Sequence, residues 1–156
     1  MIGLRAIGWQ PVVFLLAIVW AGDSAAYYAG RRWGKRKLAP VVSPKKTWEG
    51  LWGQIGAGLA FGAAAALLLF PSAAAARGAS GVPRTLLLGA ALGLVVSVVA
   101  VVGDLLESTF KRSCAVKDSG GLLPGHGGLL DRLDSLLYAS PVLLFVLTLV
   151  PGAVPR

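Results

Sequence analysis

The sequence TLLLGAALGLVVSVVAVVGDLLE, residues 85–107, decides the fold class of this chain. Its only charged residues, Asp104 and Glu107, stand at its C-terminal end. A stretch of roughly 20 predominantly apolar residues is what a helix needs to cross the hydrocarbon core of a bilayer. We therefore predict a transmembrane helix here, followed directly by the polar segment STFKRSCAVKDSGGLLPGHGGLLDRLD at residues 108–134.

Three further apolar runs, at residues 9–30, 50–70 and 135–154, have similar lengths. The whole chain is 56% hydrophobic and only 14% charged, with a mean hydropathy of +0.72, far more apolar than an ordinary soluble domain. We predict an all-α, polytopic membrane bundle of about four helices with two polar loops, forming a single domain over residues 1–156. The run at 50–70 is rich in Gly and Ala, which predicts close packing against neighbouring helices through Gly53, Ala57 and Gly58.

The first apolar run has an alternative interpretation as a secretory signal peptide, because Arg5 precedes it and small residues occur at Ala21 and Gly22. A single arginine is a weak basic region. The helical pattern also continues through residues 23–28, beyond that cleavage point. We therefore favour a retained membrane span.

Basic residues are concentrated in two of the three loops, which predicts the orientation of the bundle. The loop at 71–84 has only Arg77 and Arg84, whereas the other two loops contain the following cations: Arg31, Arg32, Lys35, Arg36, Lys37, Lys45 and Lys46, and Lys111, Arg112, Lys117 and Arg132. Cytoplasmic loops carry the excess of Lys and Arg. We expect both basic loops in the cytoplasm and both termini on the other side of a cell membrane that the chain crosses several times.

The formal net charge of +8 has three interpretations: topogenesis alone, attraction to anionic lipid headgroups, or binding of a phosphorylated substrate. Topogenesis does not require acids, yet all seven acids fall on the side of the basic loops: Asp23, Glu49, Asp104, Glu107, Asp118, Asp131 and Asp134. Inserting a carboxylate at the centre of a membrane helix costs about 2.5–3.5 kcal/mol of free energy, and less toward the helix ends. This asymmetry predicts a site that offsets the cost.

The spacing of the acids predicts where that site lies. Four polar residues share one face of a continuous helix: Asp104, Glu107, Ser108 and Lys111. Another pair of acids begins the last run, three residues apart. Oxygen ligands beside cations suit a hard ion such as Mg²⁺ that also bridges phosphates. Zinc is disfavoured because the chain has one cysteine, Cys114, and one histidine, His126, and the single cysteine leaves no intrachain disulfide.

Each of these acids also has a purely structural interpretation. Asp131 and Asp134 could stabilise the N-terminus of the last helix. Asp104 and Glu107 could form interhelix ion pairs with a cation such as Lys111, or with Arg112. Asp23 could make a structural polar contact, and Cys114 is interpreted as incidental.

The segment 108–134 resembles the hallmark pattern of the phosphatidate cytidylyltransferases, or CDP-diacylglycerol synthases. The matching residues are Ser108, Phe110, Lys111, Arg112, Lys117, Asp118, Gly120, Leu123, Pro124, His126, Gly127, Gly128, Asp131, Arg132, Leu133 and Asp134. A second matching block contains Asp23, Ala26, Tyr27, Gly30, Gly34, Lys35 and residues 43–50. Members of the family usually carry further membrane helices upstream, so this chain resembles their C-terminal, catalytic part.

The resemblance implies a reaction in which CTP and phosphatidic acid give CDP-diacylglycerol and pyrophosphate. It implies a metal site on Asp104 and Asp131, with Glu107 and Asp134 either as additional ligands or as residues that hold those ligands, and with Asp23 in support. Mg²⁺ is the implied cofactor, and a second cation is left open. Substrates and membrane lipids are the implied partners, an oligomer of identical chains is left open, and no nucleic acid is expected.

The resemblance also implies roles for the basic and glycine residues. Cations would hold the phosphates of CTP and lipid: Lys111, Arg112, Lys117 and Arg132. The backbone would approach these phosphates at Gly120, Gly121, Gly127 and Gly128. Ser43 and Lys46 are the candidates from the first basic loop, and Ser108 is a further substrate-binding candidate. His126 would hydrogen-bond a phosphate or a water molecule and is not assigned as the base.

Other functions are left open at this point. The chain could be an inactive or partner-dependent fragment of such an enzyme, or an enzyme acting on a different lipid, such as a polyprenol. A small cation-coupled transporter that uses Asp23 and Asp104 is the alternative from another class. A transporter would not account for the Lys-Asp and His-Gly-Gly sequences of the second basic loop.

Overall fold

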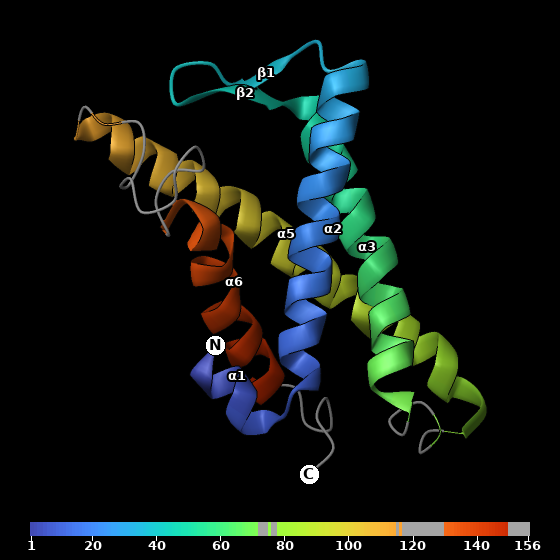
Figure 1. Ribbon diagram of the computed structural model, residues 1–156. Coiled ribbons are helices and arrows are strands. Elements are labelled where there is room, and N and C mark those ends of the chain that lie inside the picture. The colour runs from blue at the N-terminus through green and yellow to red at the C-terminus, as the bar shows by residue number, and fades with distance from the viewer. Residues whose placement is uncertain (72–74, 76–77, 115, 117–129, 150–156) are drawn as a thin grey trace.

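The computed structural model describes residues 1–71, 75, 78–114, 116 and 130–149. Figure 1 shows long helices that cross one another, with a small β-hairpin at one end of the molecule. In chain order the elements are α1 (Ile2–Ile7), α2 (Gln10–Trp33), β1 (Lys37–Ala39), β2 (Ser43–Thr47), α3 (Trp48–Leu69), the 3-10 helix η1 (Gly78–Ser80), α5 (Gly81–Ser113) and α6 (Leu130–Leu149).

The long helices coincide with the predicted apolar runs. Helices α2, α3 and α5 are each long and apolar enough to cross a membrane, and α6 contains a shorter apolar stretch, Leu133–Leu149. The prediction of an all-α polytopic membrane bundle is confirmed, and the chain is a membrane protein. Helix α5 has 33 residues and is therefore about 50 Å long at 1.5 Å per residue, so part of it extends beyond a hydrocarbon core of about 30 Å unless it is tilted.

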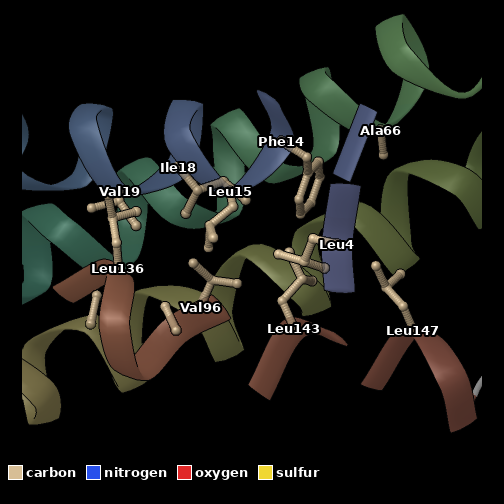
Figure 2. Close-up of a cluster of buried hydrophobic side chains, with 12 residues drawn as sticks. Leu4, Phe14, Leu15, Ile18, Val19, Ala66, Val96, Leu136, Leu143 and Leu147 are labelled. Carbon is tan, nitrogen blue, oxygen red and sulfur yellow. The ribbon is translucent and has the colours of Figure 1, made fainter. Parts of the chain in front are cut away.

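The buried core lies where α1, α2, α5 and α6 meet, with Ala66 of α3 at its edge (Figure 2). Leu15 and Ile18 of α2 face Val96 of α5 and the α6 side chains in this cluster, and both α2 side chains are fully buried. Leu4 of α1 is also fully buried and lies beside Leu143 of α6. The short helix α1 was not among the predicted elements, because its one buried side chain gives no periodic pattern.

Helices α3 and α5 cross at close range through glycines. A Cβ atom at Gly58 would lie 2.8 Å from the carbonyl oxygen of Gly93, and one at Gly62 would collide with the carbonyl oxygen of Gly89. Small residues let membrane helices approach until their backbones touch. The predicted close packing at Gly58 is confirmed, and Gly53 packs in the same way against Ala25 and Ala29 of α2.

The connection between α2 and α3 is an antiparallel β-hairpin, in which Lys37 pairs with Thr47 and Ala39 with Ser43. Only a basic loop was predicted here, because the strands are short and mostly polar. The hairpin passes directly into α3, where the Thr47 hydroxyl accepts a hydrogen bond from the backbone N–H of Gly50 at 3.1 Å. This N-terminal cap fixes the angle at which β2 enters the helix.

Candidate functional site

A cavity of about 380 Å³ lies at the hairpin end of the helices, between α2, the hairpin, α3 and α5. Its lining combines carboxylates, cations and small residues. The lining residues are Asp23, Ala26, Tyr27, Gly30, Arg31, Leu38, Lys45, Lys46, Thr47, Gly50, Leu51, Gln54, Val101 and Asp104. Two segments that are far apart in the sequence, the first basic loop and the end of α5, thus meet around one space.

An ion pair spans the cavity from the hairpin to α5. The Lys46 Nζ atom lies 2.5 Å from Asp104 Oδ2, and both side chains are partly exposed, at 23% and 33%. On the other oxygen of the same carboxylate, Ser108 Oγ donates to Asp104 Oδ1 at 3.4 Å, one helical turn further along α5. The carboxylate of Asp104 is therefore held between a cation and a hydroxyl group.

Asp23 faces the same cavity from α2. Its Oδ1 atom accepts a hydrogen bond from Gln54 Nε2 of α3 at 3.4 Å, and the Gln54 side chain is only 6% exposed. Gly22 leaves room for this amide, since a Cβ there would approach Gln54 Cγ to 3.1 Å. The charge of Asp23 interacts unfavourably with the carboxylates of Asp104 and Asp134 and favourably with Lys46, so these four groups form one electrostatic unit.

A second polar cluster follows one turn along α5. Glu107 is 6% exposed, and its Oε1 atom lies 3.3 Å from Lys111 Nζ. Asp134 of α6 interacts with the Glu107 carboxyl group through its side chain, while its Oδ1 accepts a hydrogen bond from Ser135 Oγ at 3.1 Å. The predicted shared face of α5 is confirmed, and the proposed ion pair of Glu107 is formed within that helix rather than between helices.

Other predicted site residues lie away from the cavity or outside the described part of the chain. Ser43 is half-buried in β2 and is not among the cavity-lining residues. Arg112 donates from Nε to the carbonyl oxygen of Val42 in the hairpin at 3.5 Å. Asp131 and Arg132 belong to the first turn of α6, and their side chains lie outside the part of the chain that the structure describes. Also outside the described residues are Lys117, Gly120, Gly121, His126, Gly127 and Gly128.

Arg31, Lys45 and Gln54 were not among the predicted site residues, although all three line the cavity. The two cations were counted only toward the orientation of the helices. Gln54 could have been predicted from the sequence, because it carries the one side-chain amide in the apolar run at 50–70. Such a group inside a membrane helix must find a partner.

The arrangement supplies oxygen donors for a hard cation but no complete cage. Across the described residues, no three His, Cys, Asp or Glu side chains are grouped closely enough to hold a metal ion. Asp23 and Asp104 do face one cavity, and carboxylate oxygens are the ligands that Mg²⁺ prefers. Because Mg²⁺ usually takes one or two protein carboxylates and completes its shell with phosphates and water, these donors fit that ion.

The fold and the cavity define a polytopic membrane protein with a charged site at one end of its helices. Its sequence matches the cytidylyltransferase family over residues 1–150. The chain therefore belongs to that family.

Several curated relatives are named phosphatidate cytidylyltransferase. The relative from Brucella suis is 48% identical over 141 residues, which cover 90% of this chain and 48% of that protein. The relative from Pseudomonas aeruginosa is 49% identical over 131 residues, covering 84% and 45%. The relative from Bacillus subtilis is 41% identical over 146 residues, covering 94% and 50%. The chain spans about half the length of the curated relatives it matches.

Proposed function

We propose that this chain carries the reaction centre for transfer of a cytidylyl group from CTP to phosphatidic acid, giving CDP-diacylglycerol and pyrophosphate. Family membership and the printed names of its relatives support this reaction. The single observation that carries the proposal is the cavity, which Arg31, Lys45 and Lys46 line together with Asp23 and Asp104 at one end of apolar helices. A water-soluble triphosphate and a lipid phosphate can both reach such a position.

The proposed chemistry forms one P–O bond and breaks another. A phosphate oxygen of phosphatidic acid attacks the α-phosphorus of CTP, and the bond from that phosphorus to the β-phosphate oxygen breaks, so pyrophosphate leaves with the electron pair. The attacking oxygen is already anionic, so the main task is to hold two repelling anions together and neutralise the leaving group. The cations of the cavity wall supply positive charge for both purposes.

Mg²⁺ is proposed as the cofactor, with Asp104 and Asp131 as its protein ligands and Asp23 in support. When bound, the ion would neutralise phosphate charge and orient the two substrates. Glu107 and Asp134 are proposed as additional ligands or as neighbours that hold the site, because they form a polar cluster one turn further along α5 from Asp104. The chain's own residues would position the lipid phosphate against the cavity wall, with Lys46 close to the reacting groups.

The hairpin end of the helices is proposed to face the cytoplasm, where CTP is made. The excess of basic residues in the two loops at this end supports that orientation. The predicted substrate roles of Ser43, Ser108, Lys111, Arg112, Lys117, His126 and Arg132, and of Gly120, Gly127 and Gly128, remain part of this proposal.

The test is conversion of radiolabelled CTP and phosphatidic acid to CDP-diacylglycerol by the purified chain in detergent with Mg²⁺. Asp104→Asn and Asp131→Asn nearly preserve size while removing a charge, and we expect each to lower turnover at least a hundredfold. Arg84→Gln, an exposed residue in the first turn of α5, is the matched control and should leave turnover unchanged.

Because the chain spans half of its relatives, the same assay is run after coexpression with the remaining half of a full-length relative. Turnover only in that combination would make this chain a partner-dependent catalytic part. Turnover in neither case, from folded protein, would contradict the proposed function.

A further inference from the structure

Exposed tryptophans stand at the base of the hairpin on both sides. Trp33 ends α2 and Trp48 begins α3, and their side chains are 61% and 45% exposed. Trp52, one turn further along α3, is 65% exposed. Tryptophan is enriched where the hydrocarbon core meets the headgroups. Tryptophans at both ends therefore favour a position at headgroup depth for the hairpin, the residues between Trp33 and Trp48.

The hairpin does not continue along the axes of α2 and α3. Figure 1 shows it turned sideways, over the space between these helices and the C-terminal end of α5. The hydrogen bond from Arg112 Nε to the carbonyl oxygen of Val42, at 3.5 Å, ties its turn to that end of α5. The hairpin thus lies across the ends of the helices. In a membrane that these helices cross, this direction is parallel to the membrane surface.

The exposed residues of the hairpin are of two kinds. Lys35, Arg36 and Lys37 are exposed and do not line the cavity. At the turn, Val41 is 87% exposed and follows an exposed Pro40. An exposed apolar tip beside clustered cations suits one environment in particular, the boundary between anionic headgroups and acyl chains.

We propose that the β1–β2 hairpin binds anionic phospholipid headgroups of the bilayer surface, with Lys35, Arg36 and Lys37 on the headgroups and Val41 inserted among them. This binding is separate from the substrate cavity and does not depend on the proposed reaction. It anchors the wall of the cavity from which Lys46 reaches Asp104, so the hairpin end of the site is held at the depth of lipid phosphates. Charge complementarity selects acidic lipids as the occupant.

The test uses the protein in lipid nanodiscs, which leave both membrane faces open to reagent. Cys114 is the only cysteine, so Cys114→Ser combined with Val41→Cys gives one reactive thiol at the tip. Its alkylation by an uncharged polyethylene-glycol maleimide is timed in phosphatidylcholine discs and in discs of equal phosphatidylcholine and phosphatidylglycerol. We expect the reaction to be at least about tenfold slower in the acidic discs, because each of the three basic residues near such a surface favours binding by up to about fivefold.

Adding Lys35→Gln and Lys37→Gln to this background should abolish most of the protection in acidic discs. The matched control removes two exposed cations at the other end of the helices, Arg5→Gln and Arg84→Gln, and should retain it. High salt should act like the hairpin substitutions. Equal alkylation rates in the two lipid mixtures, or protection that survives removal of Lys35 and Lys37, would overturn the proposal. Neither readout involves CTP, so failure here is distinct from failure of the proposed reaction.

Discussion

Lys46 of the hairpin and Asp104 of α5 are joined by an ion pair of 2.5 Å across the candidate cavity. The pair connects residues that are far apart in the sequence and belong to two separate polar segments. It also places a cation within reach of any phosphate that enters beside Asp104. Because both side chains are partly exposed, the pair contributes little to stability, which suggests that its position serves the site.

Replacing Lys46 should therefore affect activity much more than folding. We expect Lys46→Gln to lower turnover of CTP about a hundredfold, since a cation beside the transferred phosphate is lost. The melting temperature in detergent should change only slightly, because an exposed ion pair contributes at most about 1 kcal/mol to the free energy of unfolding. Arg84→Gln, an exposed cation in the first turn of α5 that does not line the cavity, is the control and should leave turnover intact. A large fall in melting temperature with unchanged specific activity would contradict this assignment.

The glycine contact between α3 and α5 predicts a stability difference between two substitutions in one helix. Gly62→Ala places a Cβ against the backbone of Gly89 and Gly93, whereas Gly56→Ala meets nothing within 4 Å. We expect Gly62→Ala to destabilise the protein by about 1–3 kcal/mol through overpacking. Gly56→Ala should be neutral or stabilising by about 0.5–1 kcal/mol, because alanine is the better helix former. Unfolding by sodium dodecyl sulfate in mixed micelles measures both, and equal effects would refute the close contact.

Much of the fold could be predicted because its elements are set by local sequence. The apolar run at 85–107 is long enough to cross a bilayer by itself, and the spacing of Asp104, Glu107 and Lys111 correctly placed them on one helical face. The hairpin was missed because its pairing of Lys37 with Thr47 involves few residues and no apolar alternation.

Partners across the site could not be predicted from spacing. Periodicity relates residues on one helix, but nothing in it brings Lys46 to Asp104 or Gln54 to Asp23. These contacts depend on how α2, α3 and α5 cross, and glycines determine that crossing through the absence of side chains. The predicted roles of the residues at 117–129 stay predictions, since they lie outside the described part of the chain.

The pair of Glu107 and Lys111 predicts strong coupling between two substitutions. Glu107 is almost completely buried, so Lys111→Met removes a charge partner at 3.3 Å and should destabilise the protein by about 3–5 kcal/mol. Glu107→Gln together with Lys111→Met removes both charges and should recover much of that loss. The same unfolding titration in mixed micelles gives the four corners of this cycle. Additive effects of the two substitutions would contradict a direct interaction.

Replacing Gln54 should change activity indirectly, through its hydrogen bond to Asp23. Its amide donates to Asp23 Oδ1 at 3.4 Å from a buried position, so it orients the carboxylate without itself carrying charge. Gln54→Met keeps the length of the side chain and removes the donor. We expect kcat/KM for CTP to fall about tenfold, as loss of a hydrogen bond worth about 1.5 kcal/mol to a charged group implies.

A double-substitution cycle separates this positioning role from a structural one. If Gln54 acts through Asp23, then Gln54→Met should cause little further loss of turnover in a chain that already carries Asp23→Asn. The melting temperature should hardly change, because Met fills the space of the Gln54 side chain and the exposed Asp23 carboxylate can bind water instead. A similar loss of turnover in both backgrounds, accompanied by a lower melting temperature, would mean that Gln54 supports the packing of α2 against α3 and does not orient Asp23.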